Sequence, residues 1–108
     1  MHAPTEVSYK KAVALTPFRR AVFQTVARIP KGQVRTYGEV ARQVDAPGAA
    51  RAVGTALSQN CYQDVPCHRV VRSDGRVGGY SFGGSHAKAR RLRHEGVEII
   101  RGRVVFPH

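Results

Sequence analysis

The sequence predicts one domain that is mainly α-helical and carries short β-hairpins. Three observations support this prediction: apolar residues repeat at helical spacing over residues 18–29, a helix-capping signature occupies residues 36–39, and an Asp-Gly turn signal stands at residues 74–75. A chain of 108 residues, of which 42% are hydrophobic, can build one compact core and leaves little room for a second.

The first helix is predicted over about residues 17–29. Thr16 is placed to cap its start, and Pro17 takes the first helical position, where the chain needs no N–H donor. Pro30 and the Lys31-Gly32 pair end it. The residues that form its apolar face are Phe18, Ala21, Val22, Thr25, Val26 and Ile29.

Two short helices follow, and a turn separates them. Thr36 and Glu39 form a capping box that starts the first of these, and residues 45–48 break it. The next helix is predicted over residues 49–59. The residues expected to face inward are Val40, Ala41, Val44, Val53, Ala56 and Leu57. Two short helices around a turn are typical of a helix-turn-helix.

The helix over residues 49–59 has unusually small side chains, and Arg51 is its only charged residue. Small side chains allow close approach to a neighbouring surface. In one interpretation this helix packs against a groove of DNA and the Arg51 side chain enters the groove. The other interpretation is tight packing against a neighbouring helix, with Arg51 on the solvated surface. Spacing alone leaves both open.

Short strands and a glycine-rich loop are predicted next. Val70-Val71 and Val77 flank the turn at residues 73–75, which predicts a local strand pair. Glycines at positions 78, 79, 83 and 84 predict a flexible loop around Tyr80 and Ser81.

A last helix is predicted to start at Ser85, as its cap, and to end at Gly96. Its basic face either binds phosphates or is simply solvated, and it consists of Lys88, Arg90, Arg91 and Arg93. Residues 97–106 predict a terminal hairpin.

The charge of the chain predicts a polyanionic partner. Lys and Arg number 18 against seven carboxylates, 14 of the 18 are arginine, and the formal net charge is +11. Nucleic acid or an anionic membrane surface fits this balance, and the guanidinium fork suits phosphates and base edges. No apolar run is long enough to cross a membrane, and the first residues, MHAPTEVSYKK, lack the apolar centre of a signal peptide, so we expect an intracellular, reducing location.

The densest chemical cluster is Pro66-Cys67-His68-Arg69. Positive neighbours favour the thiolate form of a cysteine, so Cys67 is a candidate nucleophile; the alternative is a buried structural cysteine followed by a hydrogen-bonded histidine. If the segment is extended, neighbouring side chains point to opposite faces, and His68 acts on Cys67 through a water. The chain has two cysteines, Cys61 and Cys67, which are too few for a disulfide scaffold. Their spacing does not match that of a structural zinc site, so no metal is expected.

This cluster resembles the active-site motif of the O6-alkylguanine-DNA alkyltransferases. Other stretches fall in the family's order and nearly its spacing: Ile29-Pro30, Thr36-Tyr37-Gly38-Glu39-Val40-Ala41, Arg51-Ala52-Val53-Gly54, Asn60, Tyr80-Ser81 and Glu95-Gly96. The resemblance runs from about Thr16 to Ile99 and covers the family's C-terminal DNA-binding and active-site domain. It implies an N-terminal segment over residues 1–15 and a winged-helix-like helix-turn-helix domain of the alkyltransferase type over residues 16–108.

The resemblance implies that the protein enters the minor groove of double-stranded DNA and flips O6-alkylguanine into a pocket. Arg51 resembles the arginine that fills the vacated space in the base stack. Tyr37 resembles the tyrosine that helps to turn the nucleotide out, and Asn60 the residue that braces the turn. Tyr80 and Ser81 belong to the loop that faces the lesion oxygen.

The resemblance also implies a DNA repair reaction. Cys67 resembles the residue that accepts the alkyl group, and His68 and Glu95 form a water-bridged relay that removes the thiol proton. The carbonyls of Cys67 and Val70 receive the guanine amino group. Because a thioether is a poor leaving group, the protein acts once as a methyltransferase, is consumed, and needs no cofactor.

Two differences from the family pattern lie beside the expected pocket. The stretch from Asn60 to Cys67 is one residue shorter and lacks a proline, and the stretch from Tyr80 to Lys88 is one residue longer. These two differences and the short chain are also features of the alkyltransferase-like proteins, which this sequence resembles as well. Those proteins bind the lesion without taking the alkyl group and flag it for excision-repair proteins.

Retention of Cys67, His68 and Glu95 favours the transferase over that alternative. A plain helix-turn-helix regulator is disfavoured, because the small-sided helix offers few base-reading side chains. We expect a monomer that is cytoplasmic and nucleoid-associated, or nuclear in a eukaryote.

Overall fold

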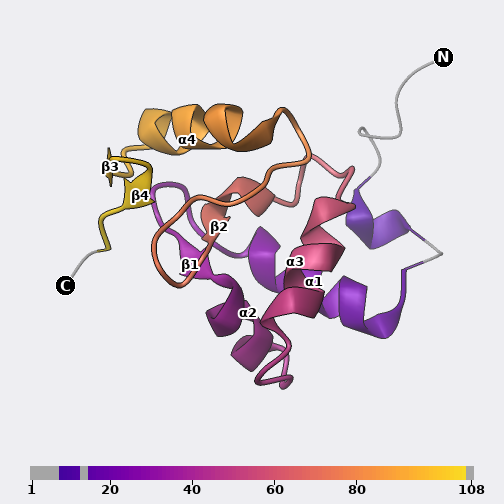
Figure 1. Cartoon of the computed structure of the whole chain (residues 1–108). Helices are drawn as coiled ribbons and strands as arrows, with labels where there is room; N and C mark the ends of the chain where they lie inside the picture. The colour runs from indigo at the N-terminus through magenta and orange to yellow at the C-terminus, as the bar shows by residue number, and fades with distance from the viewer. Residues whose placement is uncertain (1–7, 13–14, 107–108) are drawn as a thin grey trace, which may run out of the picture.

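The computed structural model describes residues 8–12 and 15–106. Over these residues the protein is a small, mainly α-helical domain, as the sequence predicts (Figure 1). The helices are η2 (Tyr9–Lys11), α1 (Pro17–Ala27), α2 (Tyr37–Gln43), α3 (Ala50–Ser58), η3 (Cys67–Arg69) and α4 (Gly84–His94), where η marks a 3-10 helix. The strands are β1 (Arg35–Thr36), β2 (Val70–Val71), β3 (Ile99–Ile100) and β4 (Arg103–Val104).

Helix α1 begins as the sequence predicts and ends slightly earlier. The Thr16 side chain accepts a hydrogen bond from the Arg19 backbone N–H at 3.2 Å, and Pro17 is the first helical residue. The last regular residue is Ala27, after which tighter hydrogen bonds close the final turn. Two of its buried residues, Val22 and Val26, belong to the predicted apolar face, whereas the third, Phe23, was not predicted to face inward.

Helices α2 and α3 form the predicted pair around a turn. Both bonds of the capping box are present: the Thr36 N–H donates to Glu39 at 2.7 Å, and the Glu39 N–H donates to the Thr36 hydroxyl at 3.1 Å. Helix α3 packs against both α1 and α2. The residues that it buries, Val53, Ala56 and Leu57, are the three predicted to face inward.

The predicted strand pair of Val70-Val71 with Val77 is wrong in its partner. The turn itself exists, since the N–H of Gly75 donates to Arg72 O and the N–H of Arg72 donates to Arg76 O, both at 2.9 Å. Strand β2, however, pairs in parallel with β1, with Arg35 opposite Val70. A turn signal determines only the local reversal, and both residues of β2 are fully buried, so their strand pairs inside the fold instead.

Helix α4 begins differently from the prediction, because Ser85 lies within its first turn and not at its cap. The capping position is Gly83, with φ 127°, and no side chain caps the helix. A side chain at Gly83 would approach the Ala87 Cβ to 3.0 Å, so a glycine lets the chain enter the helix closely. At the other end Gly96, with φ 95°, ends the helix as predicted.

The predicted terminal hairpin is confirmed. Strands β3 and β4 are antiparallel, with Ile99 opposite Val104. Two residues of positive φ join them, Arg101 at 54° and Gly102 at 78°, as a two-residue hairpin turn requires.

The buried side chains form two clusters that meet at β2. Val70 belongs to the cluster of helices α1, α2 and α3, whereas its neighbour Val71 belongs to the cluster between α4 and the terminal hairpin. Figure 1 shows the same division, with α4 and the hairpin on one side of β1 and β2 and the three other helices on the opposite side. The segment just before β2 therefore lies where the two halves meet.

Candidate active site

Cys67 lies at this junction of the two halves. The predicted extended geometry is wrong at this point: residues Cys67–Arg69 form a single 3-10 turn, closed by a hydrogen bond from the Arg69 N–H to Pro66 O at 2.9 Å. Cys67 is only 6% exposed, yet it lines two adjacent cavities. Cys61, by contrast, is exposed.

The first cavity, of about 380 Å³, brings together four of the residues singled out from the sequence. Tyr37 at the start of α2, Cys67, Tyr80 and Ser81 all line it. The wall on the α3 side consists of Gly54, Leu57 and Ser58. A cavity of this size with a thiol in its wall can hold a planar group such as a nucleobase.

The small side chains of α3 have a packing role at this wall. A side chain at Gly54 would meet the Tyr37 ring at 3.8 Å, so the helix and the aromatic ring lie in close contact. Arg51 is exposed in the first turn of the same helix, outside the cavity lining. Close packing and an exposed arginine thus occur together on α3.

The second cavity, of about 420 Å³, lies on the other side of Tyr80. His68 lines it together with Cys67, Phe82 and Arg91. The Arg91 guanidinium donates to the Tyr80 hydroxyl at 2.7 Å, and the rings of His68 and Tyr80 meet edge-on at 6.2 Å. Tyr80 is therefore held between the two cavities by contacts with α4 and η3.

A hydrogen-bonded pair lies behind Cys67. His68 is 1% exposed, and its Nε2 lies 2.9 Å from Glu95 Oε2. Burial lowers the pKa of His68 below its ordinary value, and the bond to Glu95 only partly offsets this effect. The opposite ring nitrogen, Nδ1, is buried without a hydrogen-bond partner among the described residues. His68 is thus a neutral imidazole with one nitrogen bound and one available.

Arg69 anchors the carboxylate of this pair. Its Nε and Nη2 donate to the two oxygens of Glu95 at 3.0 and 2.8 Å, and its Nη1 donates to the Ile29 carbonyl at 2.8 Å. Burial raises the pKa of Glu95, but the hydrogen bonds from Arg69 and His68 outweigh it and lower that pKa to about 2. Glu95 is therefore ionised at neutral pH and keeps one orientation.

Asn60 joins the two ends of the segment before Cys67. Its side chain donates to Val65 O at 3.1 Å and accepts from the Tyr62 N–H at 2.9 Å, and it is 3% exposed. Its own carbonyl accepts from the Ser81 hydroxyl at 3.1 Å. Asn60 thereby holds both the shortened segment and the loop of Ser81, without lining the first cavity. Val70, also outside this lining, is fully buried in β2.

Lys88 is the residue of this site that the sequence reasoning missed. Both interpretations of the basic face of α4, phosphate-binding and solvated, are wrong for Lys88, because it is completely buried, whereas Arg90, Arg91 and Arg93 are exposed. Helical spacing contained the signal: Lys88 stands four residues before the buried Leu92 and so shares its face.

The Lys88 ammonium contacts the wall of the first cavity. Its Nζ donates to Gly79 O at 3.1 Å and to the Tyr37 hydroxyl at 3.4 Å. Burial lowers the pKa of Lys88 to about 8, although the neighbouring Cys67 raises it. Burial and Cys67 also raise the pKa of Tyr37, with Arg72 opposing them. The Tyr37 hydroxyl is thus a neutral donor beside a cation.

Neither a metal cluster nor a membrane helix is found in the part of the chain that the structure describes. Within residues 8–12 and 15–106, His, Cys, Asp and Glu form no group of three or more that could hold a metal ion. None of the helices described there has the length and apolar character that crossing a membrane requires.

Comparison with known proteins places the chain among DNA-methyltransferase sequences. Residues 17–97 match the family described as 6-O-methylguanine DNA methyltransferase, DNA binding domain. A methylated-DNA--protein-cysteine methyltransferase of Shigella flexneri is 51% identical over 86 residues, covering 79% of this chain and 50% of that protein. A protein of the same name from Mycobacterium leprae is 42% identical over 103 residues, covering 94% and 62%. The chain thus spans about half the length of several curated relatives.

Solved structures share the fold. The Mycobacterium tuberculosis OGT in complex with DNA superposes with a TM-score of 0.73 at 44% identity, covering 78% of this chain and 52% of that one. The Schizosaccharomyces pombe Atl1, solved in complex with damaged DNA containing O6-carboxymethylguanine, gives a TM-score of 0.74 at 35% identity, covering 88% and 93%.

Proposed function

Because this chain belongs to the O6-methylguanine DNA methyltransferase family, we propose that it binds O6-alkylguanine in double-stranded DNA and transfers the alkyl group irreversibly to its own Cys67. The observation that carries the proposal is the position of this thiol in the wall of a base-sized cavity, between Tyr37 and Tyr80. The family match and the relatives named as methyltransferases support it.

Helix α3 is the element that we propose for the minor groove. It lines the cavity through Gly54, Leu57 and Ser58 and carries the exposed Arg51 in its first turn. A flipped guanine enters the cavity, and Arg51 takes its place in the base stack, which offsets part of the few kcal/mol that flipping costs.

The thiol proton leaves through His68. An ionised Glu95 accepts a hydrogen bond from the Nε2–H of His68. The neutral imidazole therefore has its proton on Nε2 and its lone pair on the unpartnered Nδ1. That nitrogen takes the Cys67 proton through a bridging water, and Glu95 stabilises the imidazolium that results.

In the transfer step the Cys67 sulfur forms a bond to the alkyl carbon, and the bond from that carbon to guanine O6 breaks. The electron pair goes to the guanine, where the Tyr37 hydroxyl, held by the Lys88 ammonium at 3.4 Å, stabilises the charge as a hydrogen-bond donor. The proton that His68 took from the thiol reaches the guanine through solvent. The products are S-alkylcysteine and unmodified guanine. No cofactor enters this balance, and the stable thioether limits each molecule to one turnover.

The second candidate is a protein that binds the lesion without accepting the alkyl group and marks it for excision repair. The superposition on Atl1, which extends over 93% of that chain, favours this alternative. So does the shortened segment from Asn60 to Cys67, since it lies beside the thiol. The retained trio of Cys67, His68 and Glu95 favours the transferase.

Intact-protein mass decides between the two candidates. The protein is incubated with duplex that contains one O6-methylguanine, next to a Cys67→Ala control. A gain of one methylene unit that the control lacks supports the transferase. Tight binding of the lesion at unchanged mass rejects transfer and supports the damage-binding alternative, and equal affinity for undamaged duplex contradicts both.

A further inference from the structure

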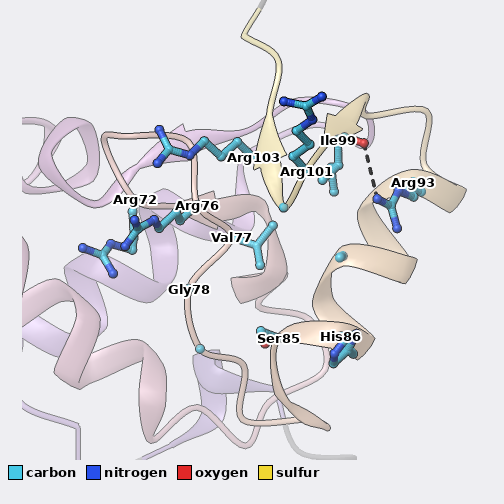
Figure 2. A pocket seen from close by; sticks show the side chains of 13 residues that line it. Arg72, Arg76, Val77, Gly78, Ser85, His86, Arg93, Ile99, Arg101 and Arg103 are labelled. Carbon is cyan, nitrogen blue, oxygen red and sulfur yellow. Dashed lines mark hydrogen bonds between the residues drawn. The ribbon is translucent and has the colours of Figure 1, made fainter.

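A groove lined by arginines lies outside the candidate active site. It has a volume of about 750 Å³ and runs between the turn at residues 72–76, helix α4 and the β3–β4 hairpin (Figure 2). Five arginines line it: Arg72, Arg76, Arg93, Arg101 and Arg103. They come from three separate segments, and the tertiary structure alone brings them together.

The groove carries a large excess of positive charge. Asp74 is the acidic residue paired with this turn, at 3.9 Å from Arg72 and 3.7 Å from Arg76. Both of these arginine side chains stay more than half exposed, at 54% and 56%, so the ion pairs are weak. The positive charge of the groove is therefore largely uncompensated.

The backbone places two of these like charges directly opposite each other. Arg76 and Arg103 form an isolated antiparallel bridge, although like charges in opposed positions destabilise a pair of strands. Arg101 stands at the hairpin turn with φ 54°, a conformation that asparagine or glycine adopts more easily. An anion bound in the groove would compensate for this repulsion.

The groove is held in shape by main-chain contacts. The Val104 N–H donates to the Gly75 carbonyl at 2.8 Å, which fastens the hairpin to the turn. A side chain at Gly75 would meet that strand at 3.2 Å. In Figure 2, Arg93 joins α4 to the hairpin through its 3.3 Å hydrogen bond to Ile99 O. The remaining four guanidiniums project from a rigid frame.

The groove adjoins the first cavity of the candidate active site. Gly79 lines both, so one short stretch of backbone separates a bound guanine from the arginines. DNA that places a base in the cavity brings its own backbone to this side of the molecule. Several guanidiniums spread along a wide groove suit a row of phosphates better than one small anion.

We infer that the groove of Arg72, Arg76, Arg101 and Arg103 binds backbone phosphates of the DNA duplex beside the flipped nucleotide. It forms a second contact in addition to the one proposed for α3. This inference rests on the proposed function for the identity of the duplex. The hairpin at residues 99–104 lies beyond the stretch that matches the family, so this contact depends on residues outside that match.

The test measures how DNA affinity depends on salt. Each phosphate contact that a protein makes releases counterions and contributes about 0.9 to the slope of log affinity against log salt concentration. The variant R101Q/R103Q and, on the facing segment, R72Q/R76Q are compared with the unaltered protein on lesion-containing duplex. The matched control R28Q/K31Q removes the same charge from exposed positions that do not line the groove.

We expect each groove variant to lower the slope by about 1.8, and the control to lower it by less than half of that amount. Equal slopes for groove and control variants overturn the inference, including the case in which the groove binds an acidic protein instead. Circular dichroism and the thermal midpoint check that the variants fold. If R101Q/R103Q disrupts the hairpin, R72Q/R76Q on the facing turn still tests the groove.

Intact mass in the same samples separates the two proposals. Unchanged slopes together with alkylated Cys67 reject the phosphate groove and leave the proposed function standing. Lowered slopes without alkylation support the groove and reject transfer, because the slope reports DNA contact independently of chemistry.

Discussion

The Lys88 ammonium of α4 lies 3.4 Å from the Tyr37 hydroxyl at the start of α2. The two residues come from opposite halves of the molecule, and Tyr37 lines the cavity that contains Cys67. A completely buried cation is destabilising unless it is compensated. The bond to Gly79 O and the face of the Tyr37 ring, 5.6 Å from Nζ, provide that compensation.

Because of Lys88, the stability of the protein is expected to increase with pH in the alkaline range. Folding lowers its pKa from 10.5 to about 8, so between these values the unfolded chain binds the proton and the folded chain does not. The contribution of this residue to the free energy of unfolding therefore increases by about 3 kcal/mol as the pH rises through this range. Denaturant unfolding at several pH values measures this, and Lys88→Met removes the gain. A variant with the same alkaline profile as the unaltered protein contradicts the assignment.

Glu95 produces the opposite dependence in acid. Its pKa falls from 4.5 to about 2 on folding, so its contribution is present above pH 4.5 and is lost as the pH falls toward 2. About 3 kcal/mol of unfolding free energy is expected to disappear over this window. Unfolding curves between pH 2 and 6 test this, with Glu98→Gln, which removes an exposed carboxylate just beyond Gly96, as the control. Glu95→Gln should flatten the acid limb and the control should not.

His68 determines the rate of alkyl transfer if it removes the thiol proton. His68→Ala is expected to slow transfer by 10²- to 10⁴-fold, as is typical for loss of a general base. Burial holds the pKa of His68 below 6.5. The unaltered protein therefore keeps its transfer rate as the pH falls to 6.5, and the rate drops only at lower pH, where His68 becomes protonated. The variant instead speeds up as the pH rises, because hydroxide replaces the lost base. Quenched time courses of protein mass measure both profiles, and parallel profiles rule out this role.

Arg51 is expected to act on the lesion more than on duplex binding. Arg51→Ala removes the stack-filling side chain but only one of 18 cations, so transfer from O6-methylguanine falls much more than affinity for undamaged duplex. Arg42→Ala removes an exposed arginine from α2 and serves as the control. Equal losses in the two assays argue against a stack-filling role.

Local signals predicted the helices well because their determinants are close in sequence. The cap at Thr16, the box of Thr36 and Glu39, and the glycine at position 96 each act within one helical turn, and all three stand where they were expected. Failures occurred where the decisive partner is remote. Strand β2 pairs with residues 35 positions earlier in the chain, and Gly83 replaces Ser85 as the cap because the loop enters α4 against Ala87.

By itself the sequence determined the helical class, the basic character and the Cys67 cluster, because composition, periodicity and short motifs are properties of neighbouring residues. Only the tertiary structure decided which groups meet. It placed Glu95 against His68, buried Lys88 under Tyr37, and gathered arginines of three segments into one groove. These contacts join residues that are far apart along the chain, and packing of the two cores around β2 brings them together.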